Sequence, residues 1–172
     1  MDKMKRFIDC SVNTFACNLK CHYCYVAQNY LFTQKVPKFK YSPGLVGETL
    51  TKQRLEGICM FNICASGETL IPNGVIEYTK AILEQGHYVM IVTNGMLTKR
   101  LEEIAQFPED YRKRLFFKIS YHYLELKRLN KFDLFFSNIE LIKKMKASFT
   151  VEVTPSDELI PYIDEMKDIT LK

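Results

Sequence analysis

Five short apolar segments alternate along the chain with segments whose apolar residues recur at helical spacing. The apolar segments have the length of strands and are rich in β-branched and aromatic residues; they are Phe7–Val12, Ile58–Cys64, Tyr88–Thr93, Leu115–Tyr121 and Phe149–Thr154. Between them lie two helical stripes, one made of Val75, Ile76, Thr79, Ile82 and Leu83 and the other of Phe135, Ile139, Ile142 and Met145. Strands that alternate with helices predict parallel βα units with right-handed crossovers.

Glycine and proline mark the ends of several predicted elements. Gly86 follows the first helical stripe, at the position where a helix commonly ends in glycine. The segment Leu159–Met166 is predicted to form the last helix, which tolerates Pro161 only in its first turn. The stretch from Gln28 to Gly47 is rich in proline and glycine and predicts an irregular loop before the first helix.

This order of elements predicts an α/β fold: a partial (β/α) barrel of about five parallel βα units, open rather than closed. The last strand then has a free edge, which is an aggregation liability unless another surface covers it. We therefore expect residues 1–172 to form one domain that is incomplete at its C-terminal end.

Size and charge limit the classes of function. A chain of 172 residues with 47% hydrophobic residues is large enough for one packed core. The net charge of +4 makes no strong case for a nucleic-acid partner, and the short basic runs are interpreted as solvated helix faces. No apolar run is long enough to span a bilayer, and the basic N-terminus leads into a short strand rather than a signal-peptide core. We expect a cytoplasmic protein with no membrane partner.

Three cysteines form the most informative motif in the chain. Cys17, Cys21 and Cys24 have the spacing C-x3-C-x2-C and follow the first predicted strand. Thiolates hold iron–sulfur clusters, and a cluster usually takes four of them. Three ligands would leave one iron of a four-iron cluster free to bind a substrate or cofactor directly.

The other three cysteines, Cys10, Cys59 and Cys64, lie inside apolar strand-like segments. We interpret them as small buried hydrophobic residues. Because the chain shows no secretion signal, the clustered triplet is better explained by a metal in a reducing compartment than by disulfides. No second cysteine cluster follows Cys64, so an auxiliary cluster is not expected.

The cysteine spacing, with Tyr23 just before the last cysteine, resembles the cluster loop of the radical S-adenosylmethionine (SAM) enzymes. Three further segments strengthen the resemblance, since each follows a successive predicted strand: Ala65–Leu70, Thr93–Gly95 and Ile119–His122. Barrels of this type place their active sites at the C-terminal ends of the strands. The resemblance covers most of the chain, although only the cysteine motif is specific by itself.

The resemblance implies roles for individual residues. Cys17, Cys21 and Cys24 would hold a 4Fe-4S cluster. The segment containing Gly67 and Glu68 is similar to the family's Gly-Gly-Glu segment, which contacts the amino group of SAM; Ser66 replaces the first glycine here. The remaining SAM contacts implied by the family pattern are Tyr23 beside the adenine, Asn94, and the pair Ser120 and His122.

Structural explanations stay open for three of these positions, Tyr23, Asn94 and His122. Tyr23 would look the same if it only packed against the barrel end, and Asn94 fits a strand-ending turn. His122 fits a histidine satisfied by backbone groups. His22, between two cysteines, is expected to face solvent, because a histidine ligand would close the open iron position. Arg128 could pair with the cofactor's carboxylate or lie on the surface.

The chemistry implied by the family is reductive cleavage of SAM to methionine and a 5′-deoxyadenosyl radical, which abstracts hydrogen from a substrate. An electron donor such as flavodoxin or ferredoxin would be a partner. The sequence leaves the substrate unknown. Two alternatives remain: a structural zinc module, which normally closes with four ligands, and a non-catalytic SAM-binding scaffold that acts through a partner.

Overall fold

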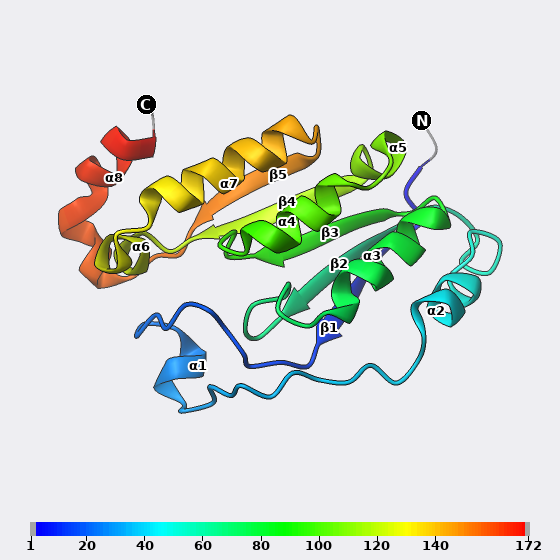
Figure 1. Ribbon diagram of the computed structural model, residues 1–172, viewed down its shortest axis with the longest axis horizontal. Coiled ribbons are helices and arrows are strands. Elements are labelled where there is room, and N and C mark those ends of the chain that lie inside the picture. The colour runs from blue at the N-terminus through cyan, green and yellow to red at the C-terminus, as the bar shows by residue number, and fades with distance from the viewer. Residues whose placement is uncertain (1–2, 171–172) are drawn as a thin grey trace.

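The computed structural model describes residues 3–170 and contains five parallel strands in one open sheet (Figure 1). The strands lie across the sheet in chain order and span Arg6–Val12 (β1), Cys59–Ala65 (β2), Tyr88–Thr93 (β3), Leu115–Tyr121 (β4) and Ser148–Val153 (β5). Each bound lies within one residue of the sequence prediction. The predicted α/β class, with about five parallel βα units in an open arrangement, is confirmed.

Helices form the crossovers between these strands. They are α1 (Tyr25–Gln28) and α2 (Pro43–Thr49) after β1, α3 (Gly74–Glu84) after β2, α4 (Thr98–Ala105) and α5 (Glu109–Arg112) after β3, and α6 (Tyr123–Leu129) and α7 (Phe132–Lys144) after β4. Figure 1 shows α3, α4 and α7 over one face of the sheet, as in a partial barrel. Within residues 3–170 none of the helices is long and apolar enough to cross a membrane.

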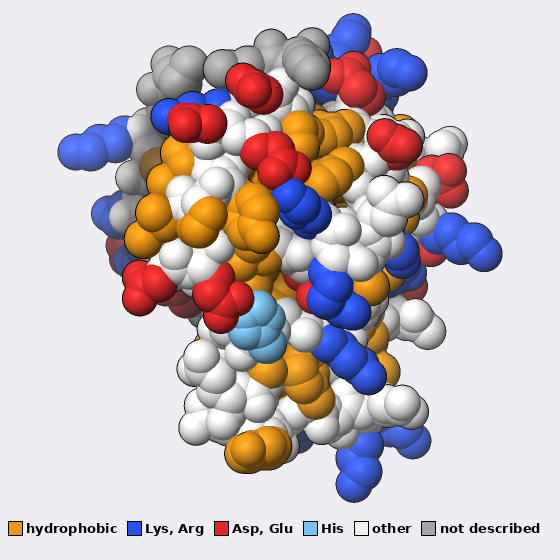
Figure 2. Space-filling view, turned by 90° about the vertical axis from the view of Figure 1, so that its left-hand side faces the viewer, with side chains coloured by type: hydrophobic (Ala, Val, Ile, Leu, Met, Phe, Trp, Pro, Cys, Tyr) orange, Lys and Arg blue, Asp and Glu red, His pale blue; other side chains and the backbone are white. Residues whose placement is uncertain are grey.

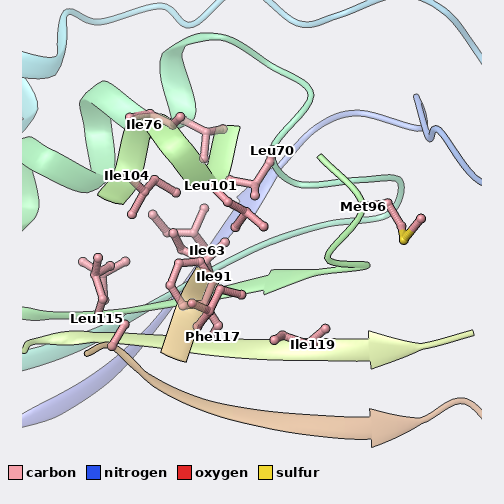
Figure 3. Packing of buried hydrophobic residues seen from close by; sticks show 14 of the residues in the cluster. Ile63, Leu70, Ile76, Ile91, Met96, Leu101, Ile104, Leu115, Phe117 and Ile119 are labelled. Atoms are coloured by element: carbon pink, nitrogen blue, oxygen red, sulfur yellow. The ribbon is translucent and has the colours of Figure 1, made fainter. Parts of the chain in front are cut away.

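The core lies between the sheet and these helices. Alternate residues of β3 and β4 are buried, because side chains alternate across a strand. In Figure 3, Ile63, Ile91 and Phe117 of the sheet gather beneath Leu101 and Ile104 of α4. Full burial of one such side chain stabilises the fold by about 1.5–3 kcal/mol, so this layer anchors the strand ends that carry the site.

Both predicted helical stripes face the core. The first is buried throughout, and the second is buried except for the partly exposed Ile139. Gly86 ends α3 as predicted: its φ is +79°, and its N–H donates to the Leu83 carbonyl at 2.9 Å. Of the three cysteines assigned to strands, Cys59 is buried and Cys10 and Cys64 are partly buried.

The predicted helix Leu159–Met166 was wrong in its bounds. The chain instead forms a 3₁₀ helix, η1 (Asp157–Tyr162), followed by α8 (Ile163–Thr170). Pro161 lies inside η1 and not in the first turn of an α-helix. Proline has no N–H to donate and its ring clashes with the preceding turn, so the α-helix begins only after it.

The predicted loop from Gln28 to Gly47 extends too far, because α2 already begins at Pro43. The Ser42 hydroxyl accepts a hydrogen bond from the Leu45 N–H at 3.2 Å and caps the helix. Proline at the first helical position supplies a backbone angle suited to a helix. The Ser-Pro pair was a start signal in the sequence that the composition of the surrounding loop obscured.

Strand β5 is the predicted free edge. Among the described residues it pairs only with β4, and its Val151 and Val153 are each 41% exposed.

Figure 2 shows the end of the molecule that carries α6 and α8, where acidic, basic and apolar side chains are mixed. Cross-element ion pairs lie in this region, including Lys127 with Glu165 at 2.6 Å. This face therefore carries no strong field of one sign.

His87 connects the first crossover to the sheet from a fully buried position. Its Nδ1 accepts the Cys59 N–H at 3.1 Å, and its Nε2 donates to the Leu50 carbonyl at 2.6 Å. One nitrogen accepts and the other donates, so the ring is neutral. Burial lowers the pKa of His87, and the cations Lys52 and Arg114 lower it further.

We expect the fold to lose stability below pH 6.5 through His87, because the unfolded imidazole takes up a proton near that pH and the folded one only at lower pH. The contribution of His87 to the free energy of unfolding has its full value above pH 6.5. It decreases as the pH falls from the pKa of the unfolded imidazole toward the lower pKa of the folded one. Urea unfolding across this range should show a shallower pH slope for His87→Gln than for the wild type. Identical slopes would contradict the assignment.

Candidate active site

A cleft of about 170 Å³ lies at the C-terminal ends of the strands. Four segments line it: the stretch after β1, the turn after β2, the end of β3 with the residue after it, and the end of β4 with the residue after it. Its lining residues are Cys17, Leu19, Cys21, Cys24, Val26, Phe32, Ala65, Ser66, Gly67, Glu68, Thr69, Val92, Thr93, Asn94, Ser120 and His122. Segments far apart in the sequence thus meet where a parallel sheet brings its strand ends together.

All three cysteines of the motif line this cleft. Cys21 is buried, whereas Cys17 and Cys24 are partly buried. The loop closes on itself where the Cys24 N–H donates to the Cys21 carbonyl at 3.1 Å, and Cys24 then caps α1. The three cysteines of the motif therefore lie around one cleft.

The buried carboxylate of Glu125 holds the loop from the side of α6. It accepts the Lys20 N–H at 3.1 Å and two hydrogen bonds from Arg128, each 2.8 Å long. Arg128 is thus committed to Glu125, and it does not line the cleft. Sequence reasoning missed Glu125; the only local signal was its spacing of three residues from Arg128 on a helix.

Burial raises the pKa of Cys17 and of Cys21 to about 11 in each case. At neutral pH both groups are therefore protonated thiols when no metal is bound. Metal ligation requires thiolates, so a bound metal would displace these protons.

The chemistry of the donor set, three cysteines around one cleft, fits an iron–sulfur cluster. Among residues 3–170, no three His, Cys, Asp or Glu side chains converge as the ligands of one metal ion. A cluster takes its thiolates on different irons, so its ligands surround a group instead of meeting at a point. Three thiols around one cleft have that arrangement.

Gly67 packs directly against the backbone of the cysteine loop. Its N–H donates to the Thr14 carbonyl, and the Glu68 N–H donates to the Ala16 carbonyl, both at 2.8 Å. A Cβ at residue 67 would clash with the carbonyl oxygen of Ala16. The glycine thus permits a close approach between two protein segments, which the sequence pattern did not distinguish from an approach to a ligand.

The Glu68 carboxylate is only 2% exposed and is committed to protein donors. It accepts the Leu70 N–H at 3.0 Å, the Thr93 hydroxyl at 2.6 Å and the Asn94 N–H at 2.8 Å. Burial raises the pKa of Glu68, and these hydrogen bonds oppose the rise. The side chain therefore connects the turn after β2 to the end of β3.

The segment Thr93–Gly95 forms the predicted strand-ending turn, with Gly95 at a φ of +72°. Asn94 nevertheless lines the cleft as well. Its Nδ2 donates to Asn18 Oδ1 at 2.8 Å and lies 3.7 Å from Cys17 Sγ. Asn94 thus belongs to the strand-ending turn and also lines the cleft.

Ser120 and His122 both line the cleft, from the end of β4. Tyr23 does not line it; its hydroxyl lies 3.3 Å from His122 Nδ1, and the two rings stack with centroids 6.0 Å apart. Burial lowers the pKa of His122, against the raising effect of Glu125. Tyr23 thus packs against an imidazole that lines the cleft, and burial favours the neutral form of this imidazole.

His22 is exposed, as expected, and its Nε2 lies 2.8 Å from Glu158 Oε2.

Eight of the nine predicted site residues line one cleft, and the ninth, Tyr23, contacts His122, which is one of the eight. Phe32 also lines the cleft and was not predicted, because it lies in the stretch that composition marked as an irregular loop.

The chain matches known proteins in sequence and in fold. The family model of the Radical SAM superfamily matches residues 12–156, which include all four cleft segments. The chain belongs to the radical SAM superfamily. Members of this superfamily use SAM and an iron–sulfur cluster. Membership therefore supports the interpretation of this chain as an enzyme.

Two curated radical SAM relatives share part of their sequence with the chain. A Methanocaldococcus jannaschii protein named as a glycyl-radical enzyme activating enzyme is 28% identical over 163 residues, which are 91% of this chain and 58% of the relative. The 7-carboxy-7-deazaguanine synthase of Thermoplasma acidophilum is 27% identical over 89 residues, which are 52% of this chain and 38% of that protein.

A solved structure shares the radical SAM fold. The structure of anSMEcpe with bound AdoMet and the Cp18Cys peptide matches with a TM-score of 0.69 at 18% identity, and the match covers 96% of this chain and 47% of that one. This likeness shows the fold. Nearly all of this chain takes part in these two matches, to the archaeal relative and to anSMEcpe, but it spans only about half the length of each of those proteins.

We expect Gly67→Ala to destabilise the protein, because the new methyl group meets backbone atoms of Ala16 that cannot move aside alone. Overpacking typically costs about 1–3 kcal/mol, and a clash with backbone belongs at the upper end. Gly44→Ala is the matched control: a Cβ there meets nothing within 4 Å, so helix propensity should raise stability slightly. Urea unfolding measures both, and a wild-type midpoint for Gly67→Ala would contradict the close approach.

Proposed function

We propose that this chain is the cofactor-binding core of a radical SAM enzyme. Cys17, Cys21 and Cys24 would hold a 4Fe-4S cluster and leave one iron open to SAM. When bound, the cluster and SAM together supply a 5′-deoxyadenosyl radical that abstracts hydrogen from a substrate. The observation that carries the proposal is the presence of three thiols from one loop in the same cleft as the ends of β2, β3 and β4.

The residues around the cleft would bind and orient SAM. The Glu68 side chain is occupied by protein donors, so contacts of the turn after β2 with the SAM amino group would fall to backbone groups near Gly67. Ser120 and the neutral His122 would offer hydrogen bonds to the polar groups of SAM. Leu19, Val26 and Phe32 would exclude water from the reacting groups.

We also propose that the substrate is a protein or a peptide segment, acted on with electrons from a donor such as flavodoxin or ferredoxin. The support for the substrate class is the name of the archaeal relative, a glycyl-radical enzyme activating enzyme that matches 91% of this chain. The free edge of β5 is compatible with further structure, so residues 1–172 would be the core domain of the working enzyme.

Anaerobic reconstitution with iron and sulfide should give about four irons per chain and, with SAM and a strong reductant, 5′-deoxyadenosine. We expect Cys21→Ala to lose both the cluster and the product. Cys64→Ala, a cysteine outside the cleft, is the control and should retain both. Zinc without iron would favour a structural metal module, and a cluster that leaves SAM intact would favour a non-catalytic scaffold.

Binding of SAM to the reconstituted protein should depend on the end of β4. We expect Ser120→Ala and His122→Gln each to weaken binding by up to about tenfold, the effect of losing one hydrogen bond. His22→Gln is the control, because its side chain is 59% exposed and does not line the cleft. Equilibrium dialysis measures the dissociation constants. Wild-type affinity in both β4 variants would remove these residues from the SAM site.

A further inference from the structure

The side-chain amide of Asn94 has a fixed orientation. Its Oδ1 accepts the Met96 N–H at 3.0 Å, so the opposite end of the amide must be the NH₂ group. Exchange of the two ends would place an NH₂ group against a backbone N–H. The donor end therefore faces the cysteine loop.

This donor end has two acceptors in the loop. Nδ2 donates to Asn18 Oδ1 at 2.8 Å and approaches Cys17 Sγ at 3.7 Å, a separation at which a sulfur acceptor still forms a hydrogen bond. An NH₂ group has two hydrogens, so it can serve both acceptors at once. The contact with Asn18 aims the second hydrogen at the sulfur.

The residue is held rigidly in this position. Asn94 is 5% exposed, and its backbone N–H donates to the buried Glu68 carboxylate at 2.8 Å. Glu68 also fixes the Thr93 hydroxyl. A donor locked in this way keeps its direction when the sulfur changes charge, which is the condition for an electrostatic effect on a bound group.

We infer that Asn94 is a positioning residue that sets the reduction potential of the cluster through Cys17, an inference that rests on the proposed function. Reduction adds one electron to the cluster and makes or breaks no bond. The N–H dipole points its positive end at the Cys17 sulfur, so it stabilises the more negative, reduced state. Hydrogen bonds to the sulfurs are among the factors that set cluster potentials. Loss of this donor makes reduction harder.

The test is a redox titration of the reconstituted protein, followed by electron paramagnetic resonance. For Asn94→Ala we expect the one-electron reduction equilibrium to shift about tenfold toward the oxidised state, which corresponds to about 59 mV. Asn94→Asp keeps the shape but replaces the donor with an acceptor, so it should lower the potential further. The reduction potential should therefore fall in the order wild type, Asn94→Ala, Asn94→Asp. A purely structural role of Asn94 would not give this order.

Asn138→Ala is the matched control. Asn138 is also a buried asparagine; its Nδ2 donates to the Gly95 carbonyl at 2.8 Å and its Oδ1 accepts the Thr98 hydroxyl at 2.9 Å. It supports the same turn, and among residues 3–170 it makes no hydrogen bond to a cysteine sulfur. We expect this variant to lose stability and to keep the wild-type potential.

A measurement on the wild type does not depend on the folding of any variant. With ¹⁵N-labelled asparagine, pulsed paramagnetic resonance of the reduced cluster should show a ¹⁵N coupling, which Asn94→Asp abolishes. If the wild type shows no coupling, the inference about Asn94 is wrong. It is also wrong if both Asn94 variants keep their clusters and the wild-type potential. Neither result affects the proposed function. Failure of the wild type to assemble any cluster overturns the proposed function together with the inference.

Discussion

The buried carboxylate of Glu68 is the constraint on which the site depends. Its hydrogen bonds hold the turn after β2 against Thr93 and Asn94 at the end of β3, while the backbone of Gly67 and Glu68 bonds the loop that leads to the cysteines. A buried carboxyl group left without hydrogen-bond donors is costly. Residues 67 and 68 thus connect the turn after β2, the end of β3 and the loop that leads to the cysteines.

The same network explains how a short cysteine loop presents three thiols to one space. Gly67 and Glu68 fix its start at Thr14 and Ala16, and Glu125 fixes its middle at Lys20. The loop is thereby positioned by the protein itself, before any cofactor contributes. Such preorganisation lowers the cost of assembling a site, and the polar groups at the end of β4 line the same cleft as the cysteines.

The sequence predicted the strands well because their side-chain pattern and flanking turns agree with the fold, as in Tyr88–Thr93, whose bounds are reproduced without change. It also predicted which strand ends would meet, since parallel strands share one C-terminal edge. It could not assign Gly67 or Tyr23 to their contacts, because an approach to protein and an approach to a ligand leave the same residue types. Glu125 was out of reach for a different reason: its role depends on the Lys20 backbone, 105 residues away in the chain.

The proposed function requires that three thiolates leave one iron of the cluster open to SAM. Mössbauer spectroscopy of protein reconstituted with iron-57, recorded with and without SAM, examines that iron. We expect SAM to change the isomer shift of one iron of the four and to leave the other three as they were. Four irons that stay alike when SAM is bound would show that the cluster has no open position, and would contradict the proposed function.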